Sequence, residues 1–210
     1  MLNIKTIKTG KWRENCYIVY DLSKSGFIID PGDNYNEIIK YINNYNINVL
    51  AIVNTHAHYD HISAVSTLKD TLEVPFYLHS KDKRLLKSAN LYRILFEGEQ
   101  TITIPSIDHF LDECNESLIF NNIEVKVIET PGHTEGSVCF QIDNFLFTGD
   151  TLFEKDIGRV DLPGGNKEQL IESLKKISEL PTSLKLYPGH GNSTILGFVM
   201  DNNQKLMALI

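Results

Sequence analysis

Most histidines in this chain stand directly after an apolar, strand-like run or in a glycine-containing turn. The sequence has seven histidines, and five of them occupy such positions. The loop at the carboxyl end of a buried strand is where binding and catalytic sites usually form in α/β folds. The distribution therefore favours a fold that gathers several strand ends at one polar site.

The segment NTHAHYDH, residues 54–61, is the densest of these motifs. It follows a short, continuous apolar run and opens a helical pattern. Alternate side chains of an extended loop face the same way, so His56 and His58 can reach one ion together. Asp60 and His61 come where the chain turns into the helix and point elsewhere. Two ligand pairs aimed at neighbouring places indicate two metal ions.

Three further ligand-type residues follow strand-like runs. His133 comes after Pro-Gly in TPGHTEGS, Asp150 ends the run FLFTGD, and His190 lies in YPGHG. A carboxylate has two oxygens, so one aspartate can bridge two ions. A single histidine at a strand end is more often a hydrogen-bonded surface residue, but these motifs in this order together indicate a metal site. His79 and His109 fit none of the motifs and are expected to be structural or surface residues.

Composition indicates a globular domain spanning residues 1–210. Apolar residues make up 42% of the chain and charged residues 22%, with a formal net charge of −7. The acidic balance argues against nucleic acid as a partner, because phosphate binding requires a basic surface. The one short basic run, Lys81-Asp82-Lys83-Arg84, is expected to be a solvated helix face.

The chain start and the cysteines bear on location. MLNIKTIKTGKWRENCYIVY has no apolar core of a signal peptide, and no apolar run is long enough to span a bilayer. Cys16 and Cys139 lie in apolar strand-like runs, where a buried free thiol is the simplest interpretation. These features predict a cytoplasmic protein with no membrane partner.

Apolar periodicity predicts many strands and a few helices. Residues 91–106 show no clear pattern. The predicted strands lie at 3–8, 16–20, 26–29, 49–53, 76–78, 117–120, 123–129, 137–142, 145–148 and 184–187, and the predicted helices at 35–44, 61–72, 81–88 and 167–179.

The order of the motifs resembles the metallo-β-lactamase superfamily over almost the whole chain. The resemblance implies an α+β fold, the αββα sandwich, with two mixed β-sheets flanked by helices and the metals at one edge. It implies two zinc ions, with iron or manganese as alternatives at one or both positions. The implied ligands are His56, His58 and His133 for the first metal and Asp60, His61 and His190 for the second, with Asp150 bridging both.

A further residue matches the first motif of this family. Asp30, in IIDPG, is implied to support the ligand loop rather than to bind metal. A turn-capping aspartate is the alternative interpretation.

One branch of the superfamily fits best. The segments GRVDLPGG, residues 158–165, and PGHGNSTILG, residues 188–197, are similar to short glyoxalase II-like hydrolases, which resemble hydroxyacylglutathione hydrolase. The resemblance implies hydrolysis of S-lactoylglutathione or another small acyl thioester. Asp60 is expected to be catalytic by orienting the attacking water. Arg159 is a candidate substrate contact, and a local ion pair with Asp161 is the alternative.

Other activities of the same fold remain open. A persulfide dioxygenase would use one iron held by the equivalents of His56, His133 and Asp150, but DLPGG favours the hydrolase branch. A β-lactamase is disfavoured because no acid for an amine leaving group is evident, and an RNA nuclease is disfavoured by the acidic charge. The segment after His190 has one basic residue, Lys205, which predicts weak selectivity for glutathione as the thiol carrier. The sequence does not define the oligomeric state.

Overall fold

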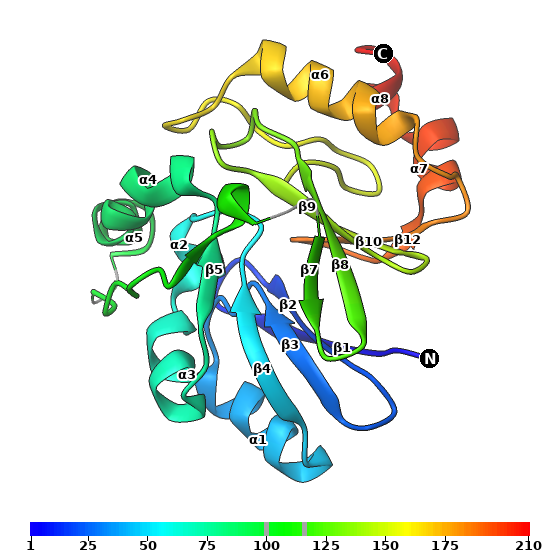
Figure 1. Ribbon diagram of the computed structural model, residues 1–210. Coiled ribbons are helices and arrows are strands. Elements are labelled where there is room, and N and C mark those ends of the chain that lie inside the picture. Colours follow the sequence, from blue (N-terminus) through cyan, green and yellow to red (C-terminus); the bar gives the residue numbers. More distant parts are fainter. Residues whose placement is uncertain (99–100, 115–116) are drawn as a thin grey trace.

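A computed structural model describes residues 1–98, 101–114 and 117–210. Within these residues the chain forms two β-sheets that pack face to face, and helices cover both outer faces (Figure 1). Helices α1 to α5 lie on the side of the first sheet, and α6 to α8 lie on the side of the second. The expected sandwich of two mixed sheets flanked by helices is confirmed.

Each sheet is mixed. The first runs in chain order, with its first three strands antiparallel and the rest parallel. It consists of β1 (Asn3–Thr9), β2 (Glu14–Tyr20), β3 (Ser25–Ile29), β4 (Asn48–Val53), β5 (Phe76–Leu78) and β6 (His109–Phe110). The second has the order β12-β11-β10-β9-β8-β7 and is antiparallel except for the pair β10–β11. Its strands are β7 (Ser117–Phe120), β8 (Ile123–Glu129), β9 (Val138–Ile142), β10 (Phe145–Gly149), β11 (Lys185–Pro188) and β12 (Thr194–Ile195).

The helices are short and mostly amphipathic. They are α1 (Tyr35–Tyr45), α2 (Tyr59–Ile62), α3 (Val65–Leu72), α4 (Lys83–Lys87), α5 (Ala89–Glu97), α6 (Lys167–Ser178), α7 (Leu196–Asn202) and α8 (Gln204–Met207), with 3-10 turns at Ser80–Asp82 and Leu111–Glu113. No helix in the described part of the chain has the length and apolar character needed to cross a bilayer.

Alternation along β2 shows how the layers are built. Successive side chains of a strand point to opposite faces. Cys16 and Ile18 therefore join the core beneath α1 and α3, while Tyr17 and Val19 join the core between the sheets. A third core lies between the second sheet and α6, where Leu174 packs with residues of β9, β10 and β11.

The observed elements differ from the predicted ones in several places. The helix predicted over 61–72 is two helices, α2 and α3, because Ala64 N donates to Pro31 O at 3.1 Å between them. Helix α5 occupies the start of the segment 91–106, for which the sequence showed no pattern; residues 99–100 lie outside the described part of the chain. The short strands β6 and β12 and the carboxyl-terminal helices α7 and α8 were not among the predicted elements.

Phe147 is the best single test of the core between the sheets. Its side chain is fully buried and makes aromatic contacts with Tyr17 and Tyr187, each at a ring-centroid distance of 5.1 Å. We expect Phe147→Ala to lower the free energy of unfolding by about 3–5 kcal/mol, through lost burial and the cavity left behind. Phe198→Ala, at a side chain that is 47% exposed, is the control and should change it by less than about 1 kcal/mol. Urea denaturation measures both, and equal losses would contradict this account of the core.

Candidate metal centre

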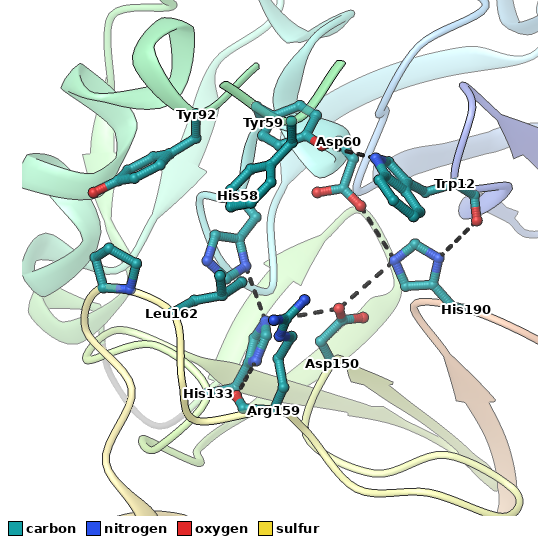
Figure 2. A pocket seen from close by; sticks show the side chains of 12 residues that line it. Trp12, His58, Tyr59, Asp60, Tyr92, His133, Asp150, Arg159, Leu162 and His190 are labelled. Atoms are coloured by element: carbon teal, nitrogen blue, oxygen red, sulfur yellow. Dashed lines mark hydrogen bonds and ion pairs between the residues drawn. The ribbon is translucent and has the colours of Figure 1, made fainter. Parts of the chain in front are cut away.

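The seven residues singled out by the sequence motifs lie together at one edge of the sandwich. They follow the carboxyl ends of strands from both sheets: the loop after β4, the turn after β8, the end of β10 and the turn after β11. Figure 2 shows His58, Asp60, His133, Asp150 and His190 around one cavity. Ligand-type atoms of His56, His58 and His133 lie within 4.8 Å of one another, and so do those of Asp60, His61 and His190.

Asp150 lies between these two groups. Its Oδ2 is 3.6 Å from Nε2 of His133 in the first group and 3.6 Å from Nε2 of His190 in the second. Its Oδ1 is 3.5 Å from Nε2 of His61. One carboxylate therefore faces both groups, as a bridging ligand would.

Hydrogen bonds from outside the cluster fix which nitrogen of His56 carries the proton. Its Nδ1 lies 3.0 Å from Thr55 Oγ1, and the Thr55 hydroxyl donates to Asp30 Oδ2 at 2.6 Å. Since that hydroxyl proton is already used, Thr55 Oγ1 accepts a bond from Nδ1–H of His56. The lone pair of His56 is then on Nε2, which faces the cluster.

The same arrangement recurs at three other histidines. Nδ1 of His61 faces Asp30 Oδ2 at 3.1 Å, and Nδ1 of His133 donates to Arg159 O at 2.8 Å. Nδ1 of His190 donates to Trp12 O at 3.1 Å. Each of these bonds holds the ring by Nδ1 and leaves the lone pair of Nε2 directed into the cluster.

Several side-chain atoms of the cluster are buried without a hydrogen-bond partner among the described residues. Nε2 of His56 and His61 and Oδ1 of Asp150 face the cluster; Nε2 of His58 is also without a partner. Nδ1 of His58 lies 2.9 Å from Nε2 of His133, so these two nitrogens face the same point, and it is Nδ1 of His58 that is available to a metal. Leaving a buried polar atom unpaired costs about 1–3 kcal/mol, and metal ions would satisfy the atoms that face the cluster. The donor set fits a dinuclear metal site.

The electrostatics divide the histidines into two kinds. Burial lowers the pKa of His56 and His58 well below the usual value, and neighbouring histidines lower it further. Burial also opposes protonation of His61 and His190, but the carboxylates of Asp150 and Asp60 outweigh it and raise the pKa of both.

Asp60 shows the reverse balance. Burial opposes ionisation of its carboxyl group, but His61 and His190 outweigh that effect and hold its pKa below the usual range. Asp60 is therefore an ionised carboxylate at neutral pH.

Asp30 lies where it can support the ligand loop. Its side chain is 1% exposed, and it accepts bonds from the backbone N–H and the hydroxyl of Thr55 at 2.7 and 2.6 Å while facing Nδ1 of His61. These are bonds to another loop, so it does more than cap its own turn.

Asp82 corrects the expectation for the run Lys81-Asp82-Lys83-Arg84. The run is not simply a solvated face, because Asp82 is 1% exposed. It accepts bonds from Ala57 N at 2.9 Å, Thr134 Oγ1 at 2.9 Å and Gly136 N at 2.8 Å. It therefore joins the loops that carry His58 and His133. A lone aspartate between lysines gave no sequence signal for this role.

Glu14 is a second supporting residue that the motifs did not indicate. It is fully buried, bonds Thr9 Oγ1 at 2.6 Å, and places Oε1 3.8 Å from Nδ1 of His61. Burial raises the pKa of this carboxyl group well above its usual value.

Glycines allow the strand ends to approach one another. A Cβ on Gly189 would lie 2.2 Å from Asp150 Oδ1, and a Cβ on Gly149 would lie 2.4 Å from Thr55 Oγ1. Gly149 also has φ +48°, a conformation that costs other residues energy. The glycines beside Asp150 and His190 therefore leave space in which the ligands meet.

The remaining histidines and Arg159 lie outside the ligand cluster. His79 is buried and accepts a bond from Lys81 N, and His109 is exposed, so neither joins the cluster. Arg159 lines the cavity, and its guanidinium forms two bonds of 2.8 and 2.7 Å with Asp161. The ion pair that the sequence left open is present, and substrate contact by Arg159 stays a prediction.

Comparisons with known proteins agree with this geometry. The model of the metallo-β-lactamase superfamily matches residues 9–190. Hydroxyacylglutathione hydrolase GloC of Haemophilus influenzae is 33% identical over 205 residues, which cover 93% of this chain and 94% of that protein.

Two solved structures are also similar over nearly their whole length. The BLEG-1 B3 metallo-β-lactamase is 37% identical with a TM-score of 0.91, covering 98% of this chain and 99% of that one. TTHA1623, solved in a di-iron-bound form, is 32% identical with a TM-score of 0.86, covering 96% and 99%.

Asp82→Asn tests the support of the ligand loops. An amide of the same size offers one acceptor oxygen, so at least one of the three donors loses its partner. We expect a loss of roughly 2–3 kcal/mol in unfolding free energy, with reduced metal content in protein purified without chelator. Asp70→Asn, on the exposed face of α3, is the matched control and should leave both unchanged. Urea denaturation and elemental analysis give the two readouts, and identical results for the two variants would show that Asp82 supports nothing.

Proposed function

Because the chain belongs to the metallo-β-lactamase superfamily, a superfamily of metal-dependent hydrolases, we propose that it hydrolyses small acyl thioesters at a two-metal centre. The observation that carries the proposal is the convergence of two complete ligand groups on Asp150. The similarity to GloC, a hydroxyacylglutathione hydrolase, supports a thioester such as S-lactoylglutathione as substrate.

The proposed ligand sets follow the two groups. His56, His58 and His133 would hold the first ion, Asp60, His61 and His190 the second, and Asp150 both. Imidazole and carboxylate donors suit zinc, and they also suit iron or manganese. The di-iron form of TTHA1623 makes iron the first alternative.

When bound, the ions would lower the pKa of a water molecule and polarise the substrate carbonyl. Asp60 would orient that water, because its carboxylate is ionised, lines the cavity and is held by His190 Nε2 at 3.3 Å. A thiolate leaves without a strong general acid because thiol pKa values are near 8.5. The residues present therefore support hydrolysis of a thioester.

β-Lactam hydrolysis is the second candidate. The similarity to BLEG-1, whose structure is described as a B3 metallo-β-lactamase, favours it. The leaving group of that reaction is an amine, which benefits from protonation as the bond breaks. Among the described residues that line the cavity, both carboxyl groups, Asp60 and Asp150, belong to the proposed ligand sets, so no carboxylic acid is left to protonate an amine, and this favours the thioester.

Metal content is the first test. We expect about two ions per chain by elemental analysis of protein purified without chelator. Asp150→Asn should lower this to one or none, because an amide offers one neutral oxygen and cannot bridge well. Asp201→Asn, at an exposed position of α7, is the control and should keep two ions per chain. A fixed content of one iron that added zinc does not change would contradict the two-metal site.

Substrate class is the second test. Metal-loaded protein should release thiol from S-lactoylglutathione without consuming oxygen, and should act on it with a higher kcat/KM than on a chromogenic β-lactam. His190→Ala should lower thioester kcat/KM by at least about a hundredfold, since it removes a ligand of one ion. Rapid oxygen uptake with glutathione persulfide, spared by His190→Ala and without thioester hydrolysis, would instead indicate the persulfide dioxygenase activity of this fold.

A further inference from the structure

The cavity beside the metal centre has an apolar side that the proposed reaction does not use. It has a volume of about 280 Å³, and the metal-ligand residues form one part of its wall. The rest of the wall consists mainly of aromatic and aliphatic side chains: Trp12, Tyr59, Tyr92, Phe96, Leu162 and Pro163. Figure 2 shows Tyr92, Tyr59 and Trp12 around the opening above the ligand cluster.

Hydrogen bonds hold two of these aromatic rings in place. Trp12 Nε1 donates to Tyr59 Oη at 2.7 Å, and the carbonyl of Trp12 holds Nδ1 of His190 at 3.1 Å. The ring of Trp12 is half exposed despite this anchoring. A preformed, partly uncovered aromatic wall that adjoins the ligands is suited to binding an apolar group.

Helix α5 supplies the opposite wall. Arg93 fixes this helix to the body through Ser63 Oγ at 2.6 Å and Asp33 Oδ2 at 3.4 Å. Tyr92 and Phe96, one helical turn apart, then line the cavity with their rings 6.5 Å apart. Phe96 remains 44% exposed, so it has apolar surface left for a ligand to cover.

Charge on this wall is scarce. Arg159 is the only lysine or arginine among the described residues that line the cavity, and Asp161 already pairs with its guanidinium through two bonds. The surroundings therefore favour an uncharged, apolar group over an anionic one.

We propose that this aromatic wall binds the acyl group of the substrate and makes the protein selective for apolar acyl thioesters, with Phe96 and Tyr92 as specificity-determining residues. The proposal rests on the proposed thioester hydrolysis and adds the class of acyl group. The carbonyl would lie at the metal centre, the acyl chain against α5, and the thiol carrier toward the open side of the cavity.

Three thioesters of one small neutral thiol test the selectivity: acetyl, butyryl and succinyl. We expect kcat/KM for butyryl to exceed that for acetyl about fifteenfold, because butyryl has two more methylenes and each buried methylene contributes roughly fourfold. Succinyl has the butyryl chain length with a terminal carboxylate, and it should be the poorest of the three. Equal rates for acetyl and butyryl, or a preference for succinyl that Arg159→Ala abolishes, would overturn the proposal.

Phe96→Ala should reduce the butyryl-to-acetyl ratio at least about threefold, because it removes apolar surface that only the longer chain reaches. Phe198→Ala is the matched control, with a phenylalanine of similar exposure, 47%, on α7, where it is not part of the cavity wall. It should leave the ratio unchanged. An equal ratio in both variants would remove Phe96 from the specificity determinants.

A binding measurement separates this proposal from the proposed function. Trp12 is the only tryptophan of the chain and lines the cavity, so its fluorescence reports occupancy. The S-butyl thioether of the same thiol, which cannot be hydrolysed, should shift the emission saturably, with weaker binding in Phe96→Ala and unchanged binding in Phe198→Ala. Saturable, Phe96-dependent binding without hydrolysis of any thioester would contradict the proposed function and leave the apolar site standing. No shift would overturn the site itself.

Discussion

The hydrogen bonds that hold the histidine rings by Nδ1 determine what the rest of this site can do. An imidazole held in this way has one orientation and one tautomer, so its Nε2 lone pair is fixed in direction. His56 is held through Thr55, His61 through Asp30, and His190 through the carbonyl of Trp12. The partners come from three different segments. The ligand geometry is therefore a property of the packed fold and not of any one motif.

Both sheets contribute to that packing. The turn that carries His190 belongs to the second sheet, but Asn15 and Tyr17 of the first sheet hold it by bonding the carbonyl of Pro188 at 2.9 and 2.6 Å. Asp82 makes the reciprocal connection, since it follows the first sheet and bonds Thr134 after β8. A shift between the sheets would move ligands of both groups relative to Asp150. Sheet packing and site geometry are consequently coupled.

That these seven side chains meet at one place could be predicted because each follows an apolar strand-like run, and strand ends are recognisable from periodicity; that they bind metal stays a prediction. The family resemblance indicated one supporting residue, Asp30, but not Asp82 or Glu14, because the sequence pattern around a buried carboxylate does not differ from that around an exposed one. Asp82 stands between two lysines, and Glu14 follows an arginine at a strand end. Their burial depends on which loops cover them. The break between α2 and α3 likewise depends on a distant carbonyl, that of Pro31.

Charge explains why the cluster is suited to cations rather than to protons alone. Asp30, Asp60 and Asp150 lie against the same histidines. Within the cluster, a proton on His61 or His190 is the positive charge that can offset these carboxylates. The carboxylates favour that proton and therefore raise the pKa of both histidines. A proton on Nε2 occupies the lone pair that a metal needs, so the two compete for one atom. Dications offer more charge at the same positions without protonating the rings, and they satisfy the unpaired Oδ1 of Asp150 as well. The apolar wall on the other side of the cavity would have a further effect once metals were bound: it would lower the local dielectric around this charge and so would strengthen the polarisation of a carbonyl placed between the wall and the ligands.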